Sequence, residues 1–307
     1  MKKYFSKSFA LLLGTVVTVA TLSCTDTEEV TNQLEHRMDI TAPVRVQVND
    51  FTMSVDDIPS TQTRAAENPA GYDCVGAITL AFYASNGTKM YEDTQLKTGD
   101  SHYTTFGVFS CNLPIGSYTM LVIARDSLKD DVFTLTSLNE AAFTSEKVRE
   151  TFCKTQNVSV TSSTPLDLSI TLSRIVPQLT IKSTDLRPTG VEKIRTTYSA
   201  GYKSFNPTTG LGIGNAGFSL INNPSAAVGK VVEFRNNTYL ATDEQTMTIT
   251  LEVLDAQDQV LITKVIPNVP LKRNRKTTLR GPLFTPAAST ASFLLETSWL
   301  EGATVNF

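Results

Sequence analysis

Apolar and polar residues alternate along most of this chain, which is the pattern of half-buried β-strands. The first clear run starts with three valines, from Val44 to Val48, that point to one face. The apolar residues of 51–55 continue the alternation in the opposite phase. We therefore predict a strand over 44–55 with a β-bulge at Asn49-Asp50, because one extra residue shifts all later side chains to the other face.

Similar short runs recur down to the C-terminus, separated by residues that favour turns. They predict strands at 77–84, 89–91, 104–109, 118–124, 158–160, 166–172, 178–183, 192–198, 246–254, 260–266, 276–284, 292–299 and 304–307. Asn86-Gly87 predicts a hairpin with a type I′ turn, and Asp255–Gln259 predicts a hairpin loop. Only 137–152 has helix-like spacing. The pattern indicates an all-β protein with a minor helix, built from antiparallel β-sandwiches.

The chain is long enough for two such sandwiches. A domain usually has about 100–200 residues, and about 284 of the 307 residues remain after the leader described below. At Leu172–Leu179 one predicted strand ends and the next begins almost without a loop. We place the boundary there, which gives an N-terminal domain over 41–173 and a C-terminal domain over 174–307.

The N-terminus has the parts of a bacterial export signal. Lysines at positions 2, 3 and 7 precede an apolar stretch over 9–22, and Ser23-Cys24 follows. The apolar stretch is shorter than the about 20 residues that span a bilayer. The segment resembles a lipobox, so we predict a lipoprotein signal peptide over 1–23 and acylation of Cys24. Ordinary cleavage or an unprocessed cysteine are the alternatives.

The residues after Cys24 are polar and lack periodicity, and they predict a tether over 24–40. Its acidic start, 25–29, resembles a tag that directs lipoproteins to the outer face of the outer membrane. A solvated linker is the alternative.

Composition argues against nucleic-acid binding and lends little support to catalysis. The net charge is −3, and His36 and His102 are the only histidines. The sequence has no nucleophile elbow, HExxH motif or EF-hand loop, so we predict no enzyme activity, no metal and no cofactor. A GxGxxG pattern occurs at 212–217, but it does not stand between a strand and a helix. A flexible surface loop is therefore favoured over a dinucleotide site.

Two further groups of residues invite a chemical interpretation. Cys74, Cys111 and Cys153 fit no CxxC or zinc spacing; three buried, unpaired thiols are favoured over one disulfide plus a free thiol. A basic cluster near the C-terminus is interpreted as a solvated strand face rather than a contact for an acidic partner. It consists of Lys272, Arg273, Arg275, Lys276 and Arg280.

These features together resemble the fimbrillin superfamily of type V pili. The resemblance rests on the lipobox, the first strand, the arginine-bearing loop Pro59–Pro69 and two halves joined at Leu172–Val176. The stretch Val269–Gly281 also resembles the second-domain pattern of anchor and minor subunits. The resemblance implies two tandem transthyretin-like sandwiches in a cell-surface fimbrial subunit, with an anchor or minor subunit favoured over a stalk subunit.

In that family, an arginine-specific protease cuts stalk subunits in a loop after the first strand. A neighbouring subunit then inserts a strand into the groove that remains. Carried to this chain, the resemblance implies a cut after Arg64 that leaves Ala65 as the new N-terminus. Arg37 and Arg45 are weaker candidates, and an uncut loop arginine is the alternative. The implied partners are other fimbrial subunits, the outer membrane through a palmitoylated N-terminus, and a host protein or glycan in adhesion.

A surface glycan-binding lipoprotein is the second hypothesis, since such proteins also combine a tether with β-sandwiches. It requires exposed aromatic side chains that stack on sugars. The candidates are Tyr198, Tyr202, Phe205 and Tyr239, although their separation along the chain favours burial.

Overall fold

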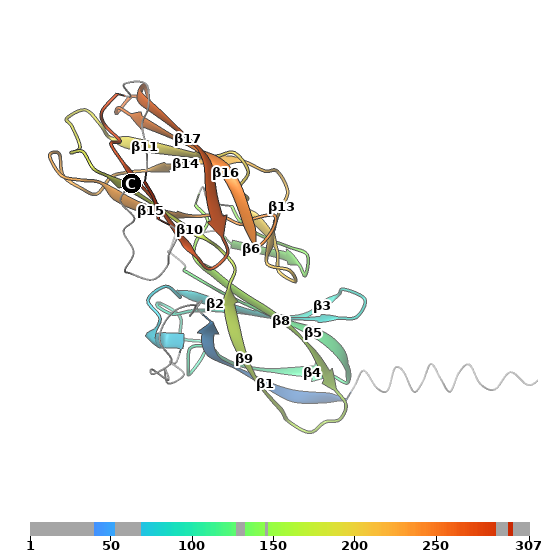
Figure 1. The fold of residues 1–307 in the computed structure, drawn as a ribbon. Coiled ribbons are helices and arrows are strands. Elements are labelled where there is room, and N and C mark those ends of the chain that lie inside the picture. The colour runs from blue at the N-terminus through green and yellow to red at the C-terminus, as the bar shows by residue number, and fades with distance from the viewer. Residues whose placement is uncertain (1–39, 53–68, 127–132, 145–146, 287–293, 297–307) are drawn as a thin grey trace, which may run out of the picture. The chain divides into compact units, whose positions relative to one another are not determined.

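The computed structural model describes residues 40–52, 69–126, 133–144, 147–286 and 294–296, and most of these residues lie in strands that turns and loops connect (Figure 1). The strands are β1 (Thr41–Thr52), β2 (Ala77–Ala84), β3 (Lys89–Leu96), β4 (Val108–Pro114), β5 (Gly116–Arg125), β6 (Phe133–Ser137), β7 (Glu140–Phe143), β8 (Thr151–Val160), β9 (Leu166–Arg174), β10 (Gln178–Ser183), β11 (Lys193–Tyr198), β12 (Ser204–Asn206), β13 (Leu211–Ile213), β14 (Phe218–Asn222), β15 (Glu233–Asn237), β16 (Glu244–Leu254), β17 (Val260–Lys272), β18 (Lys276–Gly281) and β19 (Leu294–Glu296). A single 3₁₀ turn, Pro69–Gly71, is the only helical element of the described residues.

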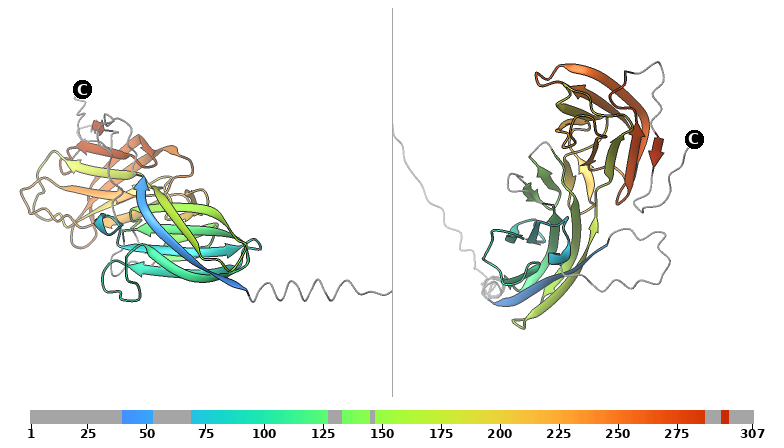
Figure 2. Two further views of the ribbon diagram at one scale, coloured as in Figure 1. Left: turned by 90° about the horizontal axis from the view of Figure 1, so that it is seen from below. Right: turned by 90° about the vertical axis from the view of Figure 1, so that its left-hand side faces the viewer.

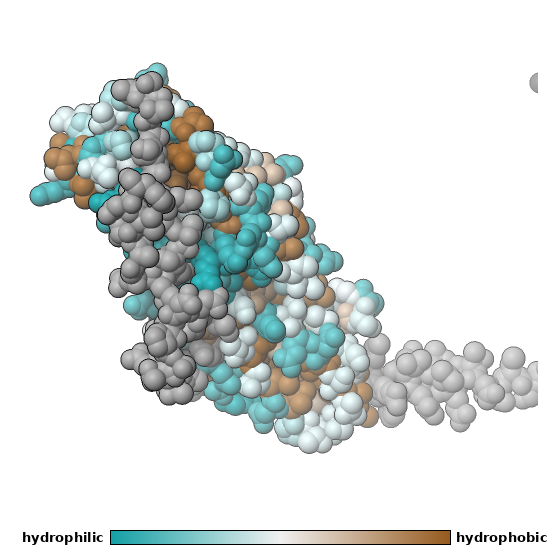
Figure 3. Space-filling model, in the orientation of Figure 1, coloured by the Kyte–Doolittle hydropathy of each residue, from teal (hydrophilic) through white to brown (hydrophobic). Residues whose placement is uncertain are grey.

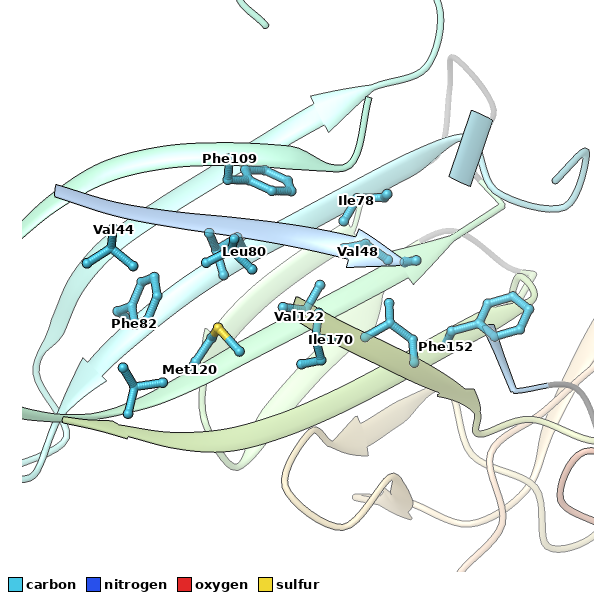
Figure 4. Packing of buried hydrophobic residues seen from close by; sticks show 14 of the residues in the cluster. Val44, Val48, Ile78, Leu80, Phe82, Phe109, Met120, Val122, Phe152 and Ile170 are labelled. Carbon is cyan, nitrogen blue, oxygen red and sulfur yellow. The ribbon is translucent and has the colours of Figure 1, made fainter. Parts of the chain in front are cut away.

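The N-terminal sandwich packs two groups of strands around one core. The strand order is β3-β2-β5-β8-β9-β1-β4, and the chain folds over where β8 meets β9 at Phe152↔Arg174 and Cys153↔Ser173. Inward side chains of β1, β4 and β9 thereby face those of β2, β5 and β8 (Figure 4). Because strands place alternate residues on one face, this core is built from every second residue of β1 and β9.

The C-terminal sandwich repeats this arrangement strand for strand. Its sheets have the orders β14-β11-β16-β17 and β15-β10-β18-β19. The first sheet matches β3-β2-β5-β8, and the first three strands of the second sheet match β4-β1-β9. Equivalent strands follow one another in the same order along the chain, and they pair in the same directions. The expectation of two tandem β-sandwiches is confirmed. The pairing is not purely antiparallel, however, because β1–β9 and β10–β18 are parallel.

Each sandwich carries one inserted hairpin, and the two hairpins pair with each other. β6–β7 lies between β5 and β8 in the chain, and β12–β13 lies between β11 and β14. Together they form a sheet with the order β13-β12-β7-β6, joined by Ser204↔Ala142 and Phe205↔Ala141. A third buried cluster lies beneath it and includes Tyr83, Phe143 and Tyr239. Residues from both halves of the chain therefore share one core.

The predicted helix over 137–152 is wrong. β6 ends at Ser137, β7 spans Glu140–Phe143, and β8 begins at Thr151. The Ser137 hydroxyl accepts the Asn139 backbone N–H and supports a tight turn between β6 and β7. Ala141 and Phe143 are buried two residues apart, which is strand spacing, and the pairing of β7 with β12 fixes it. Long-range pairing overrode a weak local helix pattern.

Several turns and strand ends were predicted with mixed accuracy. The bulge in β1 is confirmed, since the β1–β9 register shifts between Val48 and Asp50. The β2–β3 hairpin is also confirmed, but only Gly87 has a positive φ, of 84°, so the turn is not type I′. The strand expected at 104–109 begins only at Val108. The strand predicted at 304–307 and parts of 44–55 and 292–299 lie outside the described residues.

The segment between β9 and β10 is buried rather than a flexible linker. Ile175 and Val176 are about 2% and 0% exposed and belong to the shared cluster. Arg174 pairs with Glu150 and lies over the ring of Phe152, 5.0 Å from its centroid. The boundary at 173/174 stays a proposal, and the packing there joins the two halves tightly.

Candidate functional site

β1 is the central strand of one face of the N-terminal sandwich. It pairs antiparallel with β4, from Thr41↔Pro114 to Gln47↔Val108, and parallel with β9, from Val44↔Leu166 to Thr52↔Ser173 (Figure 2). Its inward side chains are almost completely buried. They are Ala42, Val44, Val46, Val48 and Phe51, with exposures of 0–3%. Removing β1 would leave two unpaired strand edges beside an open apolar cleft.

The burial of β1 makes a large contribution to the N-terminal sandwich. Burying a Val or Phe side chain contributes about 1.5–3 kcal/mol. Three valines and Phe51 then contribute on the order of 6–12 kcal/mol, which is similar to the ~5–15 kcal/mol net stability of a whole domain. The sandwich therefore needs either β1 or a strand that fills the same positions.

The residues predicted for lipidation and cleavage, Cys24, Arg64 and Ala65, lie outside the described residues, as does Arg37. Arg45 is described and lies on the outer face of β1, 4.0 Å from Asp167. It stands opposite Ser110 of β4 and Asp167 of β9 in the sheet. A protease needs access to the backbone of its target, and the backbone of Arg45 lies within the sheet between two other strands. Arg45 therefore stays the weaker candidate for cleavage.

The GxGxxG pattern lies in ordered structure rather than in a flexible loop. Gly212 belongs to β13 and donates its N–H to the Leu240 carbonyl at 2.7 Å, and Gly217 donates to the Gly201 carbonyl at 2.8 Å. A Cβ on Gly212 would lie 2.6 Å from the ring of Tyr202. These contacts give Gly212 a structural role in packing the inserted hairpin, and no helix follows the pattern.

The aromatic and basic candidates are also part of the fold. Tyr198, Phe205 and Tyr239 are at most 1% exposed, and Tyr202 is half-buried, so they offer no surface for sugars. Lys272 pairs with Glu244, and Arg273 pairs with Asp243 at 3.0 Å. Hydrophilic and hydrophobic residues are mixed on the face drawn in Figure 3.

The three cysteines of the described residues are free thiols, and only one of the three is buried as expected. Cys153 is buried, and Cys74 and Cys111 are half-buried. Burial raises the pKa of Cys153 to about 12 and those of Cys74 and Cys111 to about 11. The described residues contain no group of three or more His, Cys, Asp or Glu side chains arranged to hold a metal ion. Within the same ranges, no helix has the length and apolar character needed to cross a membrane.

The fold therefore defines a tandem β-sandwich protein whose first described strand, β1, lies between β4 and β9. The chain belongs to a family of unknown function, DUF6562, whose model matches residues 41–292. A search of curated protein sequences found no match.

Several solved structures are similar over most of both chains. They include the fimbrial anchor protein Mfa2 from Porphyromonas gingivalis, with 12% identity, coverage of 84% of this chain and 98% of that chain, and a TM-score of 0.47. A candidate adhesin from Bacteroides ovatus has 10% identity, coverage of 82% and 88%, and a TM-score of 0.47. A candidate polysaccharide-binding protein from Bacteroides thetaiotaomicron has 12% identity, coverage of 81% and 94%, and a TM-score of 0.48.

The fimbrial anchor protein among these structures belongs to the group of proteins that the sequence resembles. The similarity is a resemblance in fold, and it does not say what this chain binds.

Proposed function

We propose that this chain is a lipid-anchored protein of the outer membrane surface that serves as a fimbrial subunit in adhesion. An anchor or minor subunit is favoured over a stalk subunit, and the role is not enzymatic. The observation that carries the proposal is the position of β1, which is the first strand of the described residues and lies between β4 and β9 in its sheet. Only the connection 53–76 joins it to β2.

In this proposal the lipid and β1 act as one unit. Acylation of Cys24 holds the N-terminus at the membrane, and β1 holds the sandwich to that N-terminus. A subunit that keeps β1 stays anchored. A subunit cut after Arg64 loses the covalent link to both, and a strand from a neighbouring subunit takes the place of β1. That strand would form backbone hydrogen bonds with β4 and β9, and its apolar side chains would fill the cleft that β1 leaves.

The first experiment is to treat the purified lipidated precursor with an arginine-specific protease and sequence the new N-terminus. Arg64→Lys is the matched control, because it keeps the charge but removes the protease target. A product that begins at Ala65 and then polymerises supports a stalk subunit. Resistance, with retention at the cell surface, supports an anchor. If neither form associates with filaments in cells, the fimbrial function is refuted.

A competition experiment tests the exchange itself. A synthetic peptide of residues 41–52 is added in excess to the cleaved protein. Because this peptide restores the native partner of β4 and β9, we expect it to block polymerisation. A matched peptide with Val46→Asp places a carboxylate at a completely buried position and should not block it. Equal effects of the two peptides would rule out exchange at the β1 position.

A further inference from the structure

The N-terminal sandwich has a gap in its hydrogen bonding between β3 and β4, the two end strands of the seven-stranded order. The Gln95 side chain of β3 bridges the gap at one end. Its Oε1 accepts the Gly107 backbone N–H at 2.7 Å, and its Nε2 donates to the Val108 carbonyl at 2.8 Å. This amide is about 1% exposed. It pairs with β4 much as a backbone peptide group would.

Beyond Gln95 the gap opens into a groove of about 660 Å³, within the range of about 300–1,000 Å³ seen for ligand sites. Tyr91 and Asp93 line one side, Phe109 and Ser110 line the other, and His102 and Tyr103 lie at the rim. Facing sheets lie about 10 Å apart, and paired strands lie about 4.8 Å apart. The distance between the edges of two facing sheets is therefore about two strand spacings, which leaves room for one extended strand between them.

Both edges of the groove present backbone groups to such a strand. The Val108 carbonyl points to β3, because it accepts from Gln95. Backbone direction alternates along a strand, so the N–H and C=O of Ser110 and Asn112 point the same way. On β3, Leu96 turns its N–H to Asp100 and its carbonyl to Tyr103, away from β2. The same alternation directs Thr94 and Glu92 toward the groove.

The charge of the groove indicates which strand would fit. His102 contacts Asp100 through Nδ1 and Asp93 through Nε2, the latter at 3.1 Å. These three side chains carry one net negative charge even when the imidazole is protonated. Glu92 pairs with Lys89, and Arg45, which lines the groove on the side of β1, lies 4.0 Å from Asp167. A basic side chain on the inserted strand would neutralise the excess charge at Asp93.

We infer that the groove between β3 and β4 binds one extended peptide segment of a partner protein, with a lysine or arginine directed at Asp93. The bound segment pairs with the free edge of β4 at Ser110 and Asn112. This site is separate from the β1 position and is complete in the intact, uncut chain. It gives the protein a second surface for strand addition, one that does not require proteolysis.

The test uses the intact mature chain and a labelled peptide, acetyl-(Thr-Lys)₄-amide, whose alternation places all lysines on one face of a strand. Binding is followed by fluorescence anisotropy. A second peptide with N-methylated threonines keeps the charge but loses half of its backbone donors, and a Thr-Glu repeat reverses the charge. We expect the Thr-Lys peptide to bind at least about tenfold more tightly than either control, a factor equivalent to 1.4 kcal/mol.

Two protein variants locate the site. Ser110→Pro removes a backbone N–H on the free edge of β4 without touching the β1–β4 ladder, and it should weaken binding about tenfold. Ser110→Thr keeps the N–H and should bind within about twofold of the unchanged chain. Asp93→Asn should weaken binding of the Thr-Lys peptide about fivefold and remove its preference over the Thr-Glu peptide. Thermal unfolding checks that each variant remains folded.

Three results would overturn the inference. The first is equal binding of the N-methylated peptide, which would leave only a nonspecific charge effect. The second is binding that is unaffected by both Ser110→Pro and Asp93→Asn, or no measurable binding of any peptide. The third is a glycan-array signal that Asp93→Asn abolishes in a chain that does not bind the peptide, which would make the groove a sugar site. If Ser110→Pro fails to fold, Asp93→Asn and the peptide controls still decide the question.

Discussion

Replacing Phe51 tests most directly how far the N-terminal sandwich depends on β1. The Phe51 ring is about 3% exposed and lies edge-on to Tyr72 and Phe152, with centroid distances of 4.7 and 4.9 Å. A Phe→Ala change in a core costs about 3–5 kcal/mol, because transfer energy is lost and a cavity remains. That cost is a large part of the ~5–15 kcal/mol available to a domain. We expect Phe51→Ala to leave the N-terminal sandwich only marginally stable.

The assay is urea unfolding read by hydrogen exchange and mass spectrometry, because the two sandwiches need not unfold together. Peptides from β4 and β9 report the N-terminal sandwich, and peptides from β10 and β18 report the C-terminal one. With an m-value of about 1–3 kcal/mol per molar urea, the midpoint for β4 and β9 should fall by on the order of 1–5 M. The midpoint for β10 and β18 should change much less.

Gln47→Ala is the matched control, since Gln47 lies on the exposed face of the same strand. Its effect should stay within about 0.5 kcal/mol, as for most surface changes. If Phe51→Ala lowers the midpoint no more than Gln47→Ala, β1 does not contribute to the core as described. The energetic basis for strand exchange at β1 would then be lost.

Three other predictions follow from individual contacts. The hydrogen bond that His102 donates to Asp100, with Asp93 nearby, raises the pKa of His102 above 6.5. The protonated imidazole stabilises residues 97–107. This stabilisation is fully present below pH 6.5 and is lost as pH rises through the raised pKa. Amide exchange in 97–107 should therefore become faster, relative to an unstructured peptide, as pH rises from 6.5, and His102→Gln should abolish this change. Gly212→Ala should lower the melting temperature by the equivalent of about 1–3 kcal/mol through its clash with Tyr202, and adding Tyr202→Ala should make that substitution better tolerated. Since burial raises the pKa of every described thiol, alkylation at mildly alkaline pH should be slow, slowest at Cys153, and should become fast in denaturant.

Local patterns in the sequence were enough to place most strands. β2 at Ala77–Ala84 and β10 at Gln178–Ser183 have the predicted bounds. β2 is an apolar run that ends before Asn86-Gly87, and β10 alternates polar and apolar residues directly after Pro177. The loop at Asp255–Gln259 was also predictable, since its Asp side chain and Gln backbone close the turn locally. Such features depend on residues only a few positions apart.

Features that depend on distant residues could not be predicted in this way. The parallel pairing of β1 with β9 joins segments more than a hundred residues apart, and nothing in either strand specifies direction. β7 was assigned to a helix because its partner, β12, lies about sixty residues later. The groove could not be predicted for the same reason. Gln95 contacts Val108, and His102 contacts Asp93, only because the fold brings β3 and β4 together.

The repeated topology explains why strand exchange would be confined to one of the two sandwiches. β1 and β10 are equivalent, each lying between an antiparallel neighbour, β4 or β15, and a parallel neighbour, β9 or β18. β10, however, follows β9 after only Ile175, Val176 and Pro177, and the first two are buried in the shared cluster. Freeing β10 would break the shared core, whereas a cut in 53–68 frees β1 from the strands that follow it. β10 is thus held in the shared core, whereas β1 is the strand that the proposed function has a neighbouring subunit replace, and β1 is continuous with the predicted lipid anchor.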